Sequence, residues 1–358
     1  MVGAVNRILT RCCRQAGCAP ERVFEVSVAA NTCMHHLFLG LDPASLATAP
    51  FVPVVTEALD LPASAIGLPI HPSGRVYLLP NVAGFVGADT LAGIVASGLA
   101  HDDAWRLFID IGTNAELVLG RRGRLFACSA AAGPAFEGGN ISCGTVARAG
   151  AVSRVRWEQG RLRAETIGGE AAVGLCGAGL LDAVAVLRAC GVVRPTGRLE
   201  PPERWAAPVR AGLPWCDAPA GVVVAEGERP VVLTQRDVRE LQLAKGAIRA
   251  ACEVLLQVAG IGAAQVEEVL LAGAFGNYVD PGSALALGLI PPIPAARVRS
   301  IGNAAGTGAR LALLQRGVRE EVAALRERIQ YVALALHPGF QDAFVDGMRL
   351  GDDAGTES

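Results

Sequence analysis

The chain has 358 residues, 51% of them hydrophobic and 18% charged, and its formal net charge is −2 at pH 7. This near-balance excludes a protein that binds nucleic acid or an anionic membrane through a basic surface. No apolar run reaches the about 20 residues of a bilayer span, and the N-terminus lacks the pattern of a signal peptide. We therefore expect a cytoplasmic protein of about two domains, with no nucleic-acid or membrane partner.

The ten cysteines are expected to be mostly thiols in that compartment. The spacing C-x-x-C does not occur, so zinc and thioredoxin chemistry are unsupported. Cys12, Cys13 and Cys18 could be cluster ligands, but small apolar helix or loop residues are the favoured interpretation, because buried cysteine behaves as a hydrophobe. For His35 and His36 we likewise favour a structural or surface role over metal binding.

Apolar periodicity and turn residues predict alternating helices and strands, and hence an α/β architecture. Thr234 and Asp237 have the spacing of a capping box at the start of the clearest helix. In chain order we expect a helix at 4–17, a buried strand at 23–30, a short helix within 31–43, a strand at 76–79, a helix at 88–97, a hairpin at 107–127, paired strands at 151–170, a helix at 178–190, an excursion with a short hairpin at 194–232, a helix from 234, a strand and glycine turn at 266–276, a glycine loop and helix at 300–314, a helix near 318–330 and a strand at 331–336.

The most informative segment is LFIDIGTNAELVLG at 107–120. It predicts an apolar strand that ends at Asp110, a turn at Gly112 and Thr113, and a return strand. A carboxylate at a strand end can hold Mg²⁺ or its water, while turn N–H groups and a hydroxyl can bind phosphate oxygens. Because D-x-G-T is short, an ordinary hairpin is the alternative from these residues alone.

Three apolar strands run into turns of small residues, at 107–114, 268–276 and 300–308. Such turns suit nucleotide phosphates that are held by backbone N–H groups. The sequence contains no G-x-x-x-x-G-K-[ST], which excludes a P-loop enzyme, and no G-x-G-x-x-G after a first strand, which disfavours a dinucleotide fold.

These motifs resemble a known superfamily. DIGTN at 110–114 resembles the second phosphate motif of acetate kinases, sugar kinases, heat-shock chaperones and actin, and LAGAFGNYVD at 271–280 resembles their adenosine motif. More narrowly, the chain resembles the ATP-dependent reductive activators of corrinoid proteins. The motifs that carry this resemblance are VAANTCMHHLFLGLDP (28–43), PNVAGFVGADTLAG (80–93), CSAAAGPAFEGGNISCG (128–144), LTQRDVRELQLAKGAIRA (233–250) and LAGAFGNYVD.

The resemblance implies an actin-like ATPase (ASKHA, ribonuclease H-like) two-lobed α/β fold. This sequence departs from the family pattern in two respects: it shows no N-terminal [2Fe-2S] ferredoxin domain and no earlier D-I-G-T-T phosphate motif. We therefore expect an incomplete N-terminal lobe at 1–105, a nucleotide-binding lobe at 106–350 with the excursion at about 194–232, and a frayed tail at 351–358. No iron–sulfur cluster is expected in this chain.

The resemblance also assigns roles to individual residues. Asp110 would orient Mg²⁺ through a water molecule, and Asp89 would position the attacking water, because sugar kinases place a general base in a similar setting. The alternative for Asp89 is a helix N-cap. The residues expected to contact the nucleotide are Gly112, Thr113, Asn114, Gly133, Lys245, Gly273, Ala274, Phe275 and Gly276. For Lys245, a solvated helix position is the alternative.

The expected function is ATP binding, with or without slow hydrolysis, that supports reduction of a Co(II) corrinoid protein to Co(I). The expected cofactors are ATP and Mg²⁺, and the expected partners are the corrinoid protein and a separate ferredoxin-like [2Fe-2S] domain; a homodimer stays open. One alternative is a small-molecule kinase of the same superfamily. Another is a non-catalytic interaction module that has lost its nucleotide.

Overall fold

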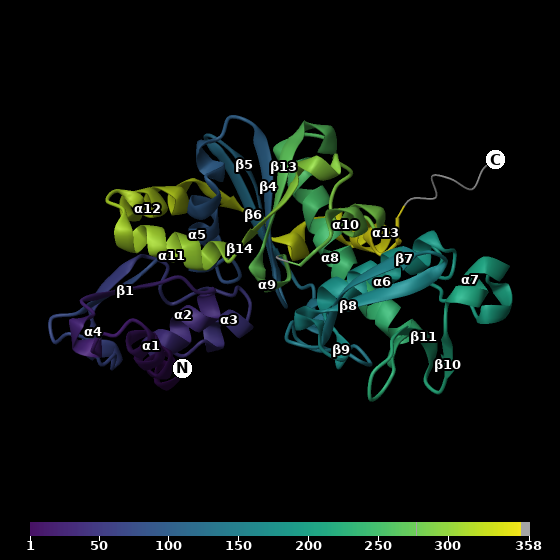
Figure 1. The fold of residues 1–358 in the computed structure, drawn as a ribbon. Coiled ribbons are helices and arrows are strands. Elements are labelled where there is room, and N and C mark those ends of the chain that lie inside the picture. The colour runs from purple at the N-terminus through teal and green to yellow at the C-terminus, as the bar shows by residue number, and fades with distance from the viewer. Residues whose placement is uncertain (277, 352–358) are drawn as a thin grey trace. The chain divides into compact units, whose positions relative to one another are not determined.

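The computed structural model describes residues 1–276 and 278–351, without the side chain of Ala274. The chain, drawn in Figure 1, divides into two compact units. Unit 1 comprises Met1–Phe108, Val118–Cys128 and Asn303–Val332. Unit 2 comprises Ile109–Leu117, Ser129–Gly302 and the chain from Ala333 onward. The consecutive strands between residues 105 and 130, here called the central hairpin, contribute residues to both units.

Unit 1 combines an N-terminal layer with two helices from late in the sequence. Its helices and strands are α1 (Val2–Gln15), β1 (Glu25–Val28), α2 (Thr32–Leu39), α3 (Ala44–Ala47), β2 (Leu59–Pro62), α4 (Ala63–Ile66), β3 (Arg75–Leu78), α5 (Ala88–Ser97), α11 (Ala304–Leu314), α12 (Val318–Arg328) and β15 (Ile329–Tyr331), with 3-10 turns η1 (Pro20–Arg22) and η2 (Leu99–His101). Strand β3 is central in a small sheet of order β1-β3-β2, parallel to β1 and antiparallel to β2.

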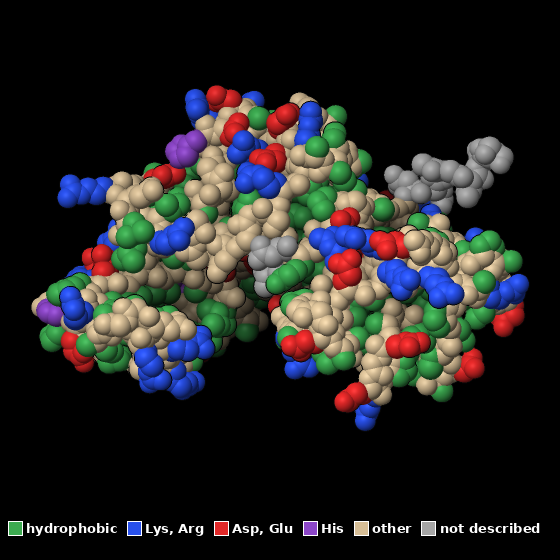
Figure 2. All heavy atoms as spheres, viewed as in Figure 1, with side chains coloured by type: hydrophobic (Ala, Val, Ile, Leu, Met, Phe, Trp, Pro, Cys, Tyr) green, Lys and Arg blue, Asp and Glu red, His purple; other side chains and the backbone are tan. Residues whose placement is uncertain are grey.

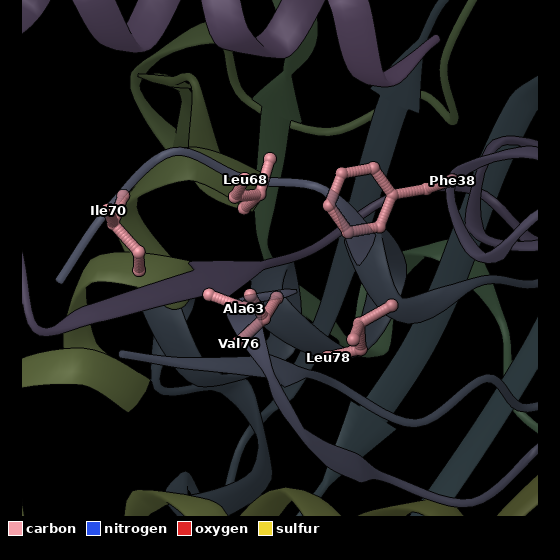
Figure 3. Close-up of a cluster of buried hydrophobic side chains, with 6 residues drawn as sticks. All are labelled: Phe38, Ala63, Leu68, Ile70, Val76 and Leu78. Atoms are coloured by element: carbon pink, nitrogen blue, oxygen red, sulfur yellow. The ribbon is translucent and has the colours of Figure 1, made fainter. Parts of the chain in front are cut away.

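A compact apolar cluster holds the N-terminal layer together. Figure 3 shows its six buried side chains, Phe38, Ala63, Leu68, Ile70, Val76 and Leu78. Val2, Val5 and Leu9 of α1 pack against this cluster, so α1 is held by the apolar face that its helical periodicity creates. Full burial of a large apolar side chain, such as Phe38, Val76 or Leu78 of this cluster, contributes roughly 1.5–3 kcal/mol.

Helices α5 and α11 lie close together within unit 1. A Cβ on Gly308 of α11 would collide with the backbone of Ala92 in α5, and one on Gly93 would come within 2.5 Å of the Phe108 ring. Glycine at these two positions is therefore required by close packing rather than by backbone conformation. Asn303 caps α11 by accepting a hydrogen bond from Gly306 N at 2.8 Å.

The central hairpin is built from β4 (Trp105–Ile111), β5 (Ala115–Arg121) and β6 (Arg124–Ala130). These strands belong to a six-stranded sheet of order β14-β13-β4-β5-β6-β15. Most of their side chains are buried, as the near-continuous apolar sequence predicts. Strand β13 pairs in parallel with β14, and β15 pairs in parallel with β6.

Unit 2 contains two further small sheets, of order β8-β7-β9 and β10-β11-β12. Its helices and strands are β7 (Ala151–Glu158), β8 (Arg161–Thr166), β9 (Gly174–Leu175), α6 (Gly177–Ala189), α7 (Ala207–Gly212), β10 (Trp215–Asp217), β11 (Ala220–Ala225), β12 (Val231–Thr234), α8 (Gln235–Ala259), β13 (Val266–Ala272), α9 (Gly273–Gly276), α10 (Pro281–Ala286), β14 (Val298–Gly302) and α13 (Phe340–Gly347). Its 3-10 turns are η3 (Pro134–Glu137), η4 (Ile167–Gly169), η5 (Pro202–Arg204), η6 (Ala263–Gln265), η7 (Ala295–Arg297) and η8 (Leu334–Leu336).

The start of α8 carries the capping box that the sequence predicts. The Thr234 side chain accepts a hydrogen bond from Asp237 N, and the Asp237 carboxylate accepts one from Thr234 N at 2.8 Å. The same carboxylate accepts a hydrogen bond from Ser142 N at 2.7 Å. Asp237 is fully buried, so one side chain both caps α8 and fixes the glycine-rich loop that contains Ser142.

Most expected elements are found within a few residues of their predicted positions. The expected strand at 331–336 is wrong in its bounds: β15 ends at Tyr331 and η8 follows at Leu334–Leu336. The strand at Leu59–Pro62 was not expected, because a four-residue segment that contains a proline gives a weak strand signal; it lies at the edge of the small sheet. Of the expected frayed tail at 351–358, residues 352–358 lie outside the described residues.

No helix among the described residues is long and apolar enough to cross a membrane. On the face drawn in Figure 2, basic and acidic side chains are interspersed among the described residues rather than separated into fields. This distribution agrees with the small net charge of the chain.

Candidate functional site

The candidate site lies in unit 2, at the end of strand β4. Asp110 is partly exposed there, and the chain turns immediately after Ile111. Gly112 N donates a hydrogen bond to the Asn114 carbonyl oxygen at 3.0 Å, which closes a tight turn into β5. The local sequence dictates this turn, since Gly112 and the polar Thr113 and Asn114 interrupt two apolar strands.

A pocket of about 280 Å³ opens at this turn. Five segments of unit 2, far apart in the sequence, form its wall. They contribute Asp110, Ile111 and Gly112; Phe136 and Glu137; Val146 and Ala147; Cys176, Gly177 and Ala178; and Gly273, Phe275 and Tyr278. The pocket therefore joins the phosphate-type turn to the glycine turn that resembles an adenosine motif.

Gly273 lies directly against Asp110. A Cβ built on Gly273 would be 2.5 Å from Asp110 Oδ1 and 2.8 Å from the Ile111 carbonyl oxygen. Gly273 also has φ +86°, a conformation that other L residues rarely adopt. Both its backbone conformation and its contact with the carboxylate therefore require glycine.

The loop after β6 is fastened to the Asp110 turn by two contacts. Gly133 N donates a hydrogen bond to the Thr113 carbonyl oxygen at 2.8 Å, and the Thr113 hydroxyl donates to the Glu137 carboxylate. Gly133 has φ +77°, which lets the loop reverse at this point. The Thr113 hydroxyl thus holds Glu137, and Glu137 joins Asp110 as a second carboxylate in the pocket wall.

Aromatic side chains line another part of the pocket. The rings of Phe136 and Phe275 are 4.3 Å apart between centroids and tilted by 33°. Both are buried, whereas Tyr278 is 41% exposed. These side chains offer apolar surface of the kind that accommodates a planar base.

The N-terminus of α6 forms another part of the wall. Its N-cap, Cys176, makes no side-chain hydrogen bond to the first turn among the described residues. Gly177 and Ala178 follow, so small residues rather than long side chains line this end of the pocket. The start of a 13-residue helix favours anions through its N–H groups and its dipole.

This helix start was not among the predicted site residues. Its sequence signal is the GLCGAG segment at 174–179, in which small residues precede a helix. A Cβ on Gly177 would collide with the backbone of Phe136, which explains the glycine and fixes α6 to the pocket wall.

Asp89 lies in unit 1, in the first turn of α5. The N-cap of α5 is Gly87, so the N-cap alternative for Asp89 is wrong. Its Oδ1 accepts a hydrogen bond from Thr90 N at 2.8 Å. Burial raises the pKa of the Asp89 carboxyl, and the hydrogen bonds from the Thr90 backbone and from its own N–H oppose that effect. A raised pKa is a property of general bases, but it also accompanies simple burial.

Lys245 lines a different cavity of unit 2, of about 590 Å³, between α8 and α13. It is the only lysine in the sequence and is 2% exposed, which excludes the solvated alternative. Its Nζ donates hydrogen bonds to the carbonyl oxygens of Gly347 and Arg349. Lys245 therefore ties α8 to the segment that ends α13.

The remaining predicted residues lie around the turns rather than in the pocket wall. Asn114 contributes its carbonyl oxygen to the Asp110 turn, and Gly276 is buried against the backbone of Leu271. Ala274 lies between Gly273 and Phe275 in α9. Among the described residues, no group of three or more His, Cys, Asp and Glu side chains is placed to hold a metal ion.

His35 and His36 of α2 are both fully buried. His36 Nδ1 lies 2.7 Å from the Thr32 carbonyl oxygen, and its Nε2 accepts a hydrogen bond from Val54 N at 2.9 Å. His36 thus joins α2 to the loop at Val54, which is the structural one of the two expected roles.

Comparison with known proteins identifies this architecture. Residues 104–356 match the family model described as "C-terminal domain of RACo the ASKHA domain", and residues 1–102 match "RACo middle region". The solved structure of a "Reductive activator for corrinoid,iron-sulfur protein" superposes with a TM-score of 0.85 at 33% sequence identity, over 96% of this chain and 55% of that one.

Two curated proteins are also similar. The "Corrinoid activation enzyme RamQ" of Eubacterium limosum is 37% identical over 353 residues, which cover 97% of this chain and 59% of that protein. The "[Co(II) methylated amine-specific corrinoid protein] reductase" of Methanosarcina barkeri is 29% identical over 302 residues, covering 77% of this chain and 51% of its own length. This chain therefore spans little more than half the length of these relatives.

The family model and the structural superposition show that this protein contains an ASKHA domain, in agreement with the expected actin-like fold. The chain belongs to the RACo family, of which it carries the middle region and the C-terminal ASKHA domain.

Proposed function

We propose that this chain binds Mg–ATP in the pocket beside Asp110 and uses it to support reduction of a Co(II) corrinoid protein to Co(I). The electrons come from a separate [2Fe-2S] domain. Two relatives are named as a corrinoid activation enzyme and as a Co(II) corrinoid protein reductase, and they support the choice of substrate. The observation that carries the nucleotide proposal is the contact of Gly273 with Asp110, which joins the two glycine turns in one pocket.

The residues of the pocket fit the chemistry of a magnesium-bound polyphosphate. Mg²⁺ commonly binds one or two protein carboxylates and keeps several waters, and Asp110 and Glu137 provide two carboxylates in one wall. The N-terminus of α6 would hold phosphate oxygens through its N–H groups. The aromatic wall of Phe136, Phe275 and Tyr278 would receive the base.

The geometry of the pocket also fits a protein that acts mainly by binding and aligning Mg–ATP rather than by forming a covalent intermediate. Bound Mg²⁺ would neutralise phosphate charge, while the protein aligns the groups. ATP can shift the protein toward a state that docks the corrinoid protein only to the extent that it binds this state more tightly. Asp89 remains our proposed positioning group for water in hydrolysis, and its raised pKa is compatible with that role.

The decisive experiment combines binding with cobalt chemistry. Isothermal titration with Mg–ATP should show a saturable binding heat for the wild-type chain and a much weaker one for Asp110→Asn. Co(II) corrinoid protein, a low-potential reductant and a ferredoxin-domain protein should give the Co(I) absorbance only when the chain and ATP are both present. Binding heat without Co(I) would leave a nucleotide protein of another kind, and a phosphorylated small molecule in a substrate screen would identify a kinase. Absence of any binding heat would contradict the proposal.

A further inference from the structure

The C-terminal end of α1 brings two cysteines together. Gly17 has φ +65°, its N–H donates to the Arg14 carbonyl oxygen at 3.2 Å, and Cys18 N donates to the Cys13 carbonyl oxygen at 3.0 Å. This pair of hydrogen bonds is the Schellman motif of a helix end. In that motif the residue after the left-handed glycine commonly contacts the residue five positions earlier, and here these residues are Cys18 and Cys13.

The backbone geometry admits a disulfide between the two residues. Because Cys18 N and Cys13 O are 3.0 Å apart, bond lengths limit the separation of the two Cα atoms to about 6.9 Å even in a straight arrangement. Any bend shortens it into the roughly 4.4–6.8 Å range that disulfides span. The Cα separation therefore satisfies one geometric requirement of a disulfide.

The two thiols also interact directly. Burial raises the pKa of the Cys13 thiol above its usual value, and the side-chain hydrogen bond with Cys18 is the next largest cause of this rise. Cys13 is 4% exposed, whereas Cys18 is partly exposed. A small oxidant can therefore reach Cys18 first, with Cys13 held next to it.

We propose that Cys13 and Cys18 form a redox-active dithiol that closes to a disulfide with a low-molecular-weight disulfide, such as oxidised glutathione, as oxidant. The Cys18 thiolate attacks one sulfur of the oxidant, which forms a mixed disulfide and releases one thiolate. Cys13 then gives up its proton, and its thiolate attacks the Cys18 sulfur and releases the second small thiol. The protein loses two protons and two electrons, and the oxidant becomes two thiols.

Closure would fix the end of α1 to the turn that leads into η1. Val5 and Leu9 of the same helix pack on the core of unit 1, so the link would stiffen an element that is already anchored at its apolar face. Because the loop is short, closing it removes little conformational entropy from the unfolded chain, and the expected signature is chemical rather than a large rise in stability.

Tryptic peptide mapping of the full chain tests the link. Trypsin separates Cys13 from Cys18 after Arg14, so the disulfide joins the peptides at 12–14 and 15–22. The protein is freed of reductant, incubated with oxidised glutathione, and its remaining thiols are alkylated. We then expect the linked pair, with a mass two hydrogens below the sum of the two reduced peptides. Dithiothreitol should make this linked pair disappear. Formation should be faster at higher pH, because Cys13 must ionise.

Cys12 provides the matched control, since it is exposed and lies in the same tryptic peptide as Cys13. Cys12→Ser should keep the link, whereas Cys13→Ser and Cys18→Ser should abolish it. Thermal melts check that each variant is folded. If Cys13→Ser does not fold, Cys18→Ser alone tests the loss of the link. The proposal is overturned if Cys12→Ser loses the link, if an unlinked 12–14 peptide carries an internal disulfide, or if Cys18 stops at the glutathione adduct.

Discussion

Gly273 and Asp110 are in contact across the candidate pocket: any side chain on Gly273 would come within 2.5 Å of Asp110 Oδ1. A residue of the adenosine-type turn therefore limits the space available to the carboxylate of the phosphate-type turn. Since the two residues are distant in the sequence, the pocket depends on a tertiary contact that neither motif specifies alone.

Substitution of Gly273 tests that contact. Gly273→Ala should weaken Mg–ATP binding about tenfold or more, equivalent to ~1.4 kcal/mol, because the methyl displaces Asp110. Gly260→Ala is the matched control, since Gly260 also has positive φ in unit 2 but no atom within 4 Å of a built Cβ. Gly260→Ala should lose roughly 1 kcal/mol of stability from backbone strain and Gly273→Ala at least as much, but only Gly273→Ala should change the Kd. Equal Kd values, measured by titration calorimetry, would show that the contact is unimportant for binding.

Asp110 should act through the metal. Asp110→Asn should raise the Kd for ATP at least tenfold in the presence of Mg²⁺ and change it little in EDTA, where the carboxylate only repels phosphate. Glu228→Gln removes an exposed carboxylate of the same unit and should leave both values unchanged. A loss of affinity for Asp110→Asn that is equal with and without Mg²⁺ would contradict the metal role.

The N-terminus of α6 can be tested by adding a cap. Cys176→Ser supplies a neutral capping hydroxyl and Cys176→Asp a charged one, and either cap contributes about 1 kcal/mol to helix stability. Both variants should keep or raise the melting temperature, whereas only Cys176→Asp should weaken Mg–ATP binding, because its carboxylate competes with phosphate. Equal affinities for the two variants would exclude a phosphate at this helix start.

Lys245 should support the fold. Lys245→Met leaves the Gly347 and Arg349 carbonyl oxygens without this donor, and we expect a loss of 1–3 kcal/mol, on the order of a buried unsatisfied group, in urea unfolding. Arg236→Met, at an exposed position of the same helix, is the control. In the folded wild-type protein an amine-reactive ester should label the N-terminus but not the single lysine. A rise in the Kd for ATP beyond the unfolded fraction would instead favour a nucleotide contact of Lys245.

His35 should give the fold a pH dependence. Burial, and secondarily the neighbouring His36, lowers the pKa of His35 from 6.5 to about 4. The folded state therefore favours the neutral imidazole of His35. The contribution of this preference to the free energy of unfolding is complete above pH 6.5 and is lost as the pH falls toward 4. The shift corresponds to about 3 kcal/mol. Urea unfolding at several pH values should show a flatter profile for His35→Leu than for wild type. Parallel profiles for His35→Leu and wild type would contradict this assignment.

The sequence predicts best the features that local chemistry specifies. The capping box at Thr234 and the turn at Gly112 follow from a few adjacent residues, and both are found at their expected positions. The resemblance supplied the fold, because several separated motifs in order are far more specific than any one of them.

The walls of the pocket could not be predicted in the same way. Phe136 and Cys176 face Asp110's pocket only because β9, α6 and the glycine-rich loop pack together, and helical or strand periodicity contains no such information. Lys245 shows the same limit, since its position on a helix does not reveal that carbonyl groups from residues 347 and 349 surround its amine. The nucleotide roles of the predicted residues stay predictions until the variants above are measured.

Asp237 has a consequence for how this protein can vary. Its carboxylate is shared between the first turn of α8 and Ser142, so the loop that supplies Phe136 and Glu137 takes its position from a helix in another part of the chain. Insertions or deletions between 138 and 142 would have to preserve this anchor, whereas length changes in the β10–β11 hairpin, which lies outside the pocket lining, are free of that constraint. Tolerance to evolutionary lengthening should therefore be uneven across unit 2.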